Sequence, residues 1–193
     1  MALWFAARFA SGTIAAGLLI GLFVAAFPDL RFVFPSVTSG ALRDIPLATV
    51  LALAPSIVWV IGRDRSLLRD DRLGQRSLQV ALLDVALLGA AMVACAAPAA
   101  ATMQWATLAS LMSASLAFSG LTLLASAHPH ATTPKVVAPV YLLVCLIAAF
   151  QGFEPDPAPW AWPLLEAPSP LAIIASAVLF VFGGSLFALR QNR

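Results

Sequence analysis

The chain has 193 residues, of which 61% are hydrophobic and only 10% are charged, and its mean hydropathy is +0.93. Soluble domains carry about 25% charged residues, so this composition excludes an ordinary soluble protein and indicates a membrane protein. The net charge of +2 is too small to favour a nucleic-acid partner.

Six apolar segments approach the length of about 20 residues that a helix needs to cross the hydrocarbon core of a bilayer. In chain order they are 7–27, 45–61, 78–97, 103–127, 136–150 and 171–189. Their continuous apolar character favours helices over the alternating strands of a barrel. The sequence therefore predicts an all-α polytopic integral membrane protein with six transmembrane helices, folded as a single transmembrane domain over residues 1–193.

Several residues predict where these helices begin, bend or end. The first apolar segment continues well past the length of a signal-peptide core, so it is interpreted as a retained span. Asp44 and Pro46 are predicted to cap and open the second helix, and Pro55 to kink it. Pro98 is predicted to end the third helix, which leads through a tight connection into the fourth.

The connection between the second and third helices has an unusual composition. Residues 62–77, GRDRSLLRDDRLGQRS, contain five of the 11 basic and three of the nine acidic residues of the chain. Good helix formers and opposite charges at helical spacing predict a short amphipathic cytoplasmic helix in this segment. Its small apolar face would consist of Leu67, Leu68 and Leu73.

Two interpretations of this segment remain open. Its arginines could simply meet anionic lipid headgroups, as in an ordinary cytoplasmic loop. Alternatively, the leucines could fill a groove on a soluble partner while the arginines fix the orientation, and Asp70 and Asp71 favour this interpretation because a lipid-facing loop gains nothing from acids. The predicted docking residues are Arg65, Leu67, Leu68, Arg69, Arg72 and Leu73.

The distribution of basic residues predicts the orientation in the membrane. Nine basic residues fall on the side of the amino terminus, the 62–77 segment, Lys135 and the carboxyl terminus, whereas Arg31 and Arg43 fall on the other side. Because basic residues concentrate on the cytoplasmic side, both termini are expected in the cytoplasm of a cell whose plasma (inner) membrane holds the protein. The outer segment 153–172 contains six prolines and two tryptophans, and it is either an exposed interfacial loop or a partly embedded helical hairpin.

This arrangement resembles the type-2 ABC exporter permeases. The resemblance is topological: it rests on six spans, cytoplasmic ends, the charged segment 62–77 and the outer segment 153–170. It implies that residues 62–77 form a coupling helix that docks a soluble ATP-binding subunit, and that MALWFAARF corresponds to an elbow helix before the first span. It further implies a permease subunit of an ATP-driven exporter, which works with a second permease copy or a similar permease subunit and needs no cofactor. The chain has no GxxxxGK[ST] motif, so ATP hydrolysis is expected on a separate chain.

The polar residues of the apolar segments indicate alternative functions. Asp84 is the one acid within a predicted span, and an intramembrane acid can carry an ion or a proton. A small ion-coupled carrier would ordinarily need more than one such residue. A substrate-binding six-helix subunit of a vitamin or metabolite importer has the same size and helix count, and it remains an alternative.

An intramembrane enzyme is a weaker alternative. The fourth span and its end carry hydroxyl and imidazole groups, namely Ser110, Ser113, Ser115, Ser119, Thr122, His128 and His130. The GxSG motif of serine–histidine membrane proteases is absent, and small residues at helical spacing favour close helix packing instead. The two histidines have no nearby acid or thiol, so no metal site is expected. We therefore expect no catalytic activity on this chain.

Overall fold

The structure is a computed structural model that describes residues 10–35, 42–70, 78–102, 104–127, 133–149, 157–165 and 168–191. These parts of the chain form seven α-helices, one 3-10 helix and one two-stranded sheet. In chain order they are α2 (Ala10–Ala26), β1 (Arg31–Pro35), β2 (Leu42–Pro46), α3 (Leu47–Leu51), α4 (Ala54–Asp70), α5 (Leu78–Ala101), α6 (Trp105–Ser126), α7 (Thr133–Ala148), η1 (Pro159–Leu164) and α8 (Pro170–Gln191).

By helix length and composition, the chain is a helical membrane protein. The helices α5, α6 and α8 are each long and apolar enough to cross a bilayer. Three shorter apolar helical segments accompany them, Ala10–Ala26, Leu47–Arg63 and Pro134–Ala148. A mostly helical fold with apolar helices long enough to cross a membrane is thus confirmed, and the small sheet was not predicted from the sequence.

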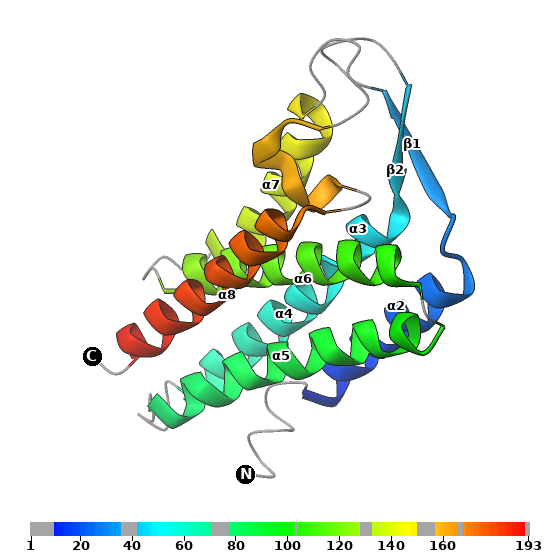
Figure 1. The fold of residues 1–193 in the computed structure, drawn as a ribbon. Helices are drawn as coiled ribbons and strands as arrows, with labels where there is room; N and C mark the ends of the chain where they lie inside the picture. Colours follow the sequence, from blue (N-terminus) through cyan, green and yellow to red (C-terminus); the bar gives the residue numbers. More distant parts are fainter. Residues whose placement is uncertain are drawn as a thin grey trace.

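The helices pack around two clusters of buried side chains. The helices α2 and α5 form one closely packed pair, and α6 and α8 form another. The helix α7 lies against α6 on the side away from α5, and it approaches α4 less closely. Figure 1 shows the ends of α4, α6 and α8 together with the start of α5 at one end of the molecule, and the sheet at the opposite end.

Glycines allow the two helix pairs to come into backbone contact. A Cβ atom added to Gly17 or Gly21 of α2 would collide with the carbonyl oxygen of Ala91 or Cys95 of α5. A Cβ added to Gly120 of α6 would lie 2.7 Å from the backbone nitrogen of Phe180 in α8. Small residues are the usual means by which membrane helices approach this closely, because lipid provides no hydrophobic driving force between them.

The second apolar segment differs from the predicted single helix at its start. Asp44 lies in β2, which pairs antiparallel with β1, so it does not cap the helix as predicted. The residue before α3 is Pro46, whose side chain makes no capping hydrogen bond. The helix is interrupted near the predicted kink, because α3 ends at Leu51 and α4 begins at Ala54, one residue before Pro55, whose ring nitrogen cannot donate a hydrogen bond.

The prediction that Pro98 ends the third helix is wrong. The helix α5 continues to Ala101, three residues beyond the proline. In the last turn of a helix a proline removes only one hydrogen bond, and the carbonyl oxygen of Pro98 itself accepts bonds from the amide and the hydroxyl of Thr102, at 3.2 and 3.3 Å. The connection to α6 is short, as predicted.

The segment 153–172 packs on the bundle where the structure describes it. Within η1, Ala161 and Leu164 are buried in the same cluster as Phe118 of α6. The indole nitrogen of Trp162 donates to the hydroxyl of Ser176 in α8 at 2.9 Å. This part of the segment is therefore anchored between the helices and is not an exposed loop.

Candidate functional site

The charged residues that follow the second apolar segment lie on α4 itself. The helix runs without interruption from Ala54 to Asp70, so the segment 64–70 is its direct continuation and not the start of a separate amphipathic helix. Apolar side chains in the first half of α4 give way to charged ones from Arg63 onward. We refer to residues 63–70 as the charged end of α4.

The structure places most of the predicted docking residues on this charged end. Arg65, Leu67, Leu68 and Arg69 fall within α4. Arg72 and Leu73 lie outside the described residues, so the predicted docking set is placed only in part. A 17-residue helix is about 25 Å long, so α4 connects the charged end with the core of the bundle.

Arg63 fixes the charged end of α4 to the neighbouring helix α8. Its guanidinium carbon lies 4.5 Å from the ring centre of Phe187 and 5.5 Å from that of Trp59. The two rings meet edge to face, with their centres 5.9 Å apart and their planes at 75°. Trp59 and Phe187 are almost completely buried, and Arg63 is 9% exposed. An arginine held over aromatic faces in a desolvated setting contributes about 2 kcal/mol.

Asp84 lies in the same region of the bundle. It is 1% exposed on α5, between residues that line the cluster of Trp59 and Phe187, namely Ala81, Leu87 and Leu88. Asp84 is engaged in an interaction, in agreement with the expectation that a carboxylate within a span needs a partner. Arg63 and Asp84 are the two charged side chains that are buried in the described part of the chain.

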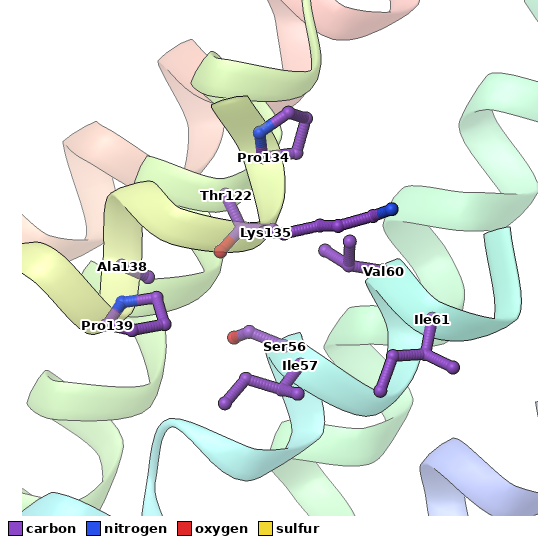
Figure 2. Close-up of a pocket in the computed structure, with 9 residues that line it drawn as sticks. All are labelled: Ser56, Ile57, Val60, Ile61, Thr122, Pro134, Lys135, Ala138 and Pro139. Carbon is purple, nitrogen blue, oxygen red and sulfur yellow. The ribbon is translucent and has the colours of Figure 1, made fainter. Parts of the chain in front are cut away.

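A cavity of about 180 Å³ lies close to this region, between α4, α6 and α7 (Figure 2). Its walls are mainly apolar and include Ile57 and Val60 of α4 and Ala138 of α7. Lys135, at the start of α7, borders the cavity, and Figure 2 shows its side chain extended from α7 toward the α4 side. The sequence analysis did not identify this cavity, because residues from three separate helices form it.

The hydroxyl groups of α6 connect helices. Ser119 lies 3.1 Å from the hydroxyl of Ser56 in α4, and Ser113 lies 3.1 Å from that of Ser176 in α8. Thr122 donates to the carbonyl oxygen of Phe118 one turn earlier, at 2.7 Å. These contacts agree with the packing interpretation of the small residues in the fourth span.

The remaining candidate residues are placed as follows. Ser110 donates to the carbonyl oxygen of Leu165 at 3.2 Å and thereby holds the end of η1. Ser115 is buried in α6, and His128 and His130 lie outside the described residues. Among the residues that the structure describes, no group of three His, Cys, Asp or Glu side chains could hold a metal ion.

Two features of the site were missed from the sequence for different reasons. The pairing of Trp59 with Phe187 depends on how α4 and α8 pack, and no local pattern indicates it. The GxxxG pattern formed by Gly17 and Gly21 was available in the sequence and would have predicted a close contact of α2 with another helix.

Comparison with known proteins found no match to a protein family, to a curated protein or to a solved structure.

Proposed function

We propose that the chain is the membrane-spanning permease subunit of an ATP-driven, ABC-type exporter, and that it docks a separate soluble ATPase through residues 62–77. The three long and three shorter apolar helices would then be six spans, in a plasma (inner) membrane, with both termini in the cytoplasm. A second permease copy, or a similar subunit, would complete the transport path, because six helices are too few to enclose a large path on their own.

One observation carries the proposal, the continuity of α4. A docking segment must transmit conformational changes of the ATPase to the transmembrane helices. A segment on a separate, loosely connected helix would transmit them poorly. Here the charged end shares one helix with Ser56 and Trp59, which lie in the core of the bundle. Through Arg63 the same helix contacts α8, so a displacement of the charged end would reach two helices at once.

The positive charge of this end supports the proposed orientation. Arg63, Arg65 and Arg69 lie on α4, Lys135 lies at the start of α7, and Arg190 lies in the last turn of α8. Figure 1 shows the ends of α4 and α8 at the same end of the molecule. Under the positive-inside rule this end would face the cytoplasm, where a soluble ATPase is available.

The experiment is a purification of the tagged chain from its own host in a mild detergent. We expect a soluble subunit with ATPase activity to be retained. Replacing Leu67 and Leu68 together by Ser should release this subunit without preventing membrane insertion, because apolar anchors dominate the affinity of interfaces. Replacing Arg69 and Arg72 by Glu should weaken retention in a manner that depends on salt.

Leu189→Ser is the matched control. Leu189 is 62% exposed near the end of α8, so this variant places a similar apolar-to-polar change at the same end of the molecule, outside the proposed docking segment. It should retain the ATPase. Unchanged retention in the double leucine variant would contradict the docking role, and it would favour the interpretation in which the arginines meet lipid headgroups.

A further inference from the structure

The cavity between α4, α6 and α7 is suited to an apolar group. A cavity of about 150 Å³ with apolar walls stays dry and accommodates a molecule of the size of benzene, and the present cavity measures about 180 Å³. Ser56 and Thr122 supply hydroxyl groups to its walls, but these are already bonded within the protein, to Ser119 and to the carbonyl oxygen of Phe118. An apolar occupant would therefore leave neither hydroxyl without a hydrogen bond.

The position of the cavity indicates where such an occupant comes from. Ile57 and Ile61, two of its lining residues, are 37% and 47% exposed, so this wall continues onto the outer surface of the bundle. In a membrane this surface faces lipid. The cavity is thus accessible to the acyl chains that surround the protein, without passage through the bundle.

Lys135 adds a charge requirement. It is the only lysine of the chain, it is exposed, and its side chain borders the cavity at the end where α7 begins. A cation beside an apolar slot matches a ligand with an anionic head and an apolar tail. Basic residues near the cytoplasmic surface attract anionic lipids by about 1 kcal/mol each.

We propose that this cavity binds a short segment of an acyl chain, of about the volume of benzene, from an anionic phospholipid of the surrounding leaflet, and that Lys135 holds the phosphate of its headgroup. The acyl chain enters laterally between α4 and α7, past Ile57 and Ile61. The site is formed by one copy of the chain, so it does not depend on an ATPase or on the proposed transport function.

The test is native mass spectrometry of the purified chain, released from vesicles that contain equal amounts of phosphatidylglycerol and phosphatidylcholine. The wild type should retain one phosphatidylglycerol in preference to phosphatidylcholine. Lys135→Gln should lower this retention about fivefold, the effect of one lysine on an anionic lipid, and Lys135→Arg should preserve it. Arg190→Gln removes an exposed cation from the end of α8, outside the cavity, and should leave the retention of phosphatidylglycerol unchanged.

A second variant tests the cavity itself. Ala138 is 1% exposed and lines the cavity, so Ala138→Leu should fill it and abolish retention of the lipid. If this variant does not fold, Ile57→Trp blocks the entrance from a partly exposed position instead. Equal retention of both lipids, an adduct with the mass of a free fatty acid, or retention that both a cavity variant and Lys135→Gln leave unchanged would overturn the proposal.

Discussion

The guanidinium group of Arg63 lies over the ring of Phe187, at 4.5 Å, and this contact joins α4 to α8 at the level where α4 changes from apolar to charged. The arginine belongs to the helix that carries the proposed docking residues, whereas the phenylalanine belongs to the last helix of the chain. Arg63 therefore has two roles that a surface arginine lacks, because it fills space in the core and fixes the distance between two helices.

Phe187→Leu tests this contact. The leucine keeps an apolar side chain in the core but removes the aromatic face, so we expect the chain to lose about 2 kcal/mol of stability in detergent. Phe182→Leu is the matched control, because Phe182 is on the same helix but is 55% exposed. Thermal unfolding followed by circular dichroism measures both variants. Equal losses of stability in the two variants would show that the contact between Arg63 and the ring of Phe187 does not stabilise the chain.

The backbone contact between α6 and α8 predicts a steric effect. An alanine at position 120 would place its Cβ 2.7 Å from the backbone nitrogen of Phe180, and backbone atoms cannot give way without separating the helices. We expect Gly120→Ala to destabilise the chain by about 1–3 kcal/mol, as overpacked cores do. Gly89→Ala meets no atom within 4 Å, so it should be neutral or slightly stabilising. A stable Gly120→Ala variant would disprove the close approach of α6 and α8.

Ser176, at the opposite end of α8, makes hydrogen bonds that a substitution by alanine would remove. Its hydroxyl accepts the indole N–H of Trp162 and lies 3.1 Å from the hydroxyl of Ser113. Ser176→Ala would leave these partners without their bond, at a cost of about 1–3 kcal/mol. Ser185→Ala removes an exposed hydroxyl that donates to the carbonyl oxygen of Val181 in its own helix, so the stability of this control variant should hardly change. Limited proteolysis of the 157–165 segment should accelerate in the first variant and not in the second.

The buried charges Arg63 and Asp84 predict a coupled pair of mutations. We expect Arg63→Gln and Asp84→Asn each to destabilise the chain by about 3–5 kcal/mol if the other charge stays buried alone, and the double variant to lose less than the sum. Strictly additive losses would place the partner of Asp84 elsewhere. If Asp84→Asn changes neither stability nor assembly nor transport, Asp84 is no structural anchor, and an ion-coupled carrier loses its one acid within a span.

The orientation can be tested by thiol labelling. Cys95 and Cys145 are buried, so the native chain should react little with a membrane-impermeant thiol reagent. Ser66→Cys should react only after the cells are opened, whereas Ala158→Cys should react in intact cells. Labelling of Ser66→Cys from outside would reverse the proposed orientation, and with it the docking of a cytoplasmic ATPase.

The sequence predicted the positions of the helices well, because continuous apolar runs are local features, whereas the prediction from Pro98 was wrong. The fourth span was expected at 103–127 and α6 covers Trp105–Ser126. The small sheet was missed because each of its strands has only five residues, and a hairpin of that size depends on its surroundings. One contact of the sheet with its surroundings is the hydrogen bond from the amide of Leu47 to the carbonyl oxygen of Leu30, at 3.0 Å.

The candidate site was less predictable than the fold. The charge pattern of 62–77 identified the charged stretch, but it did not indicate that residues 63–70 of this stretch continue the helix before them without a break. The aromatic partners of Arg63 and the cavity beside Lys135 depend on how several helices pack together. Such contacts between distant residues leave no periodicity in one sequence, so pattern reasoning cannot find them.

The glycine contacts also bear on how the bundle could change shape. Where two backbones touch, as Gly17 of α2 does with α5 and Gly120 of α6 does with α8, separation would break close contacts along the whole crossing. The pairs α2–α5 and α6–α8 should therefore each move as a rigid body. The helices α4 and α7 touch less extensively and border a cavity, so separating them would break fewer contacts than separating either closely packed pair. Any motion that opens the bundle sideways is expected to begin there, next to the helix that carries the charged end.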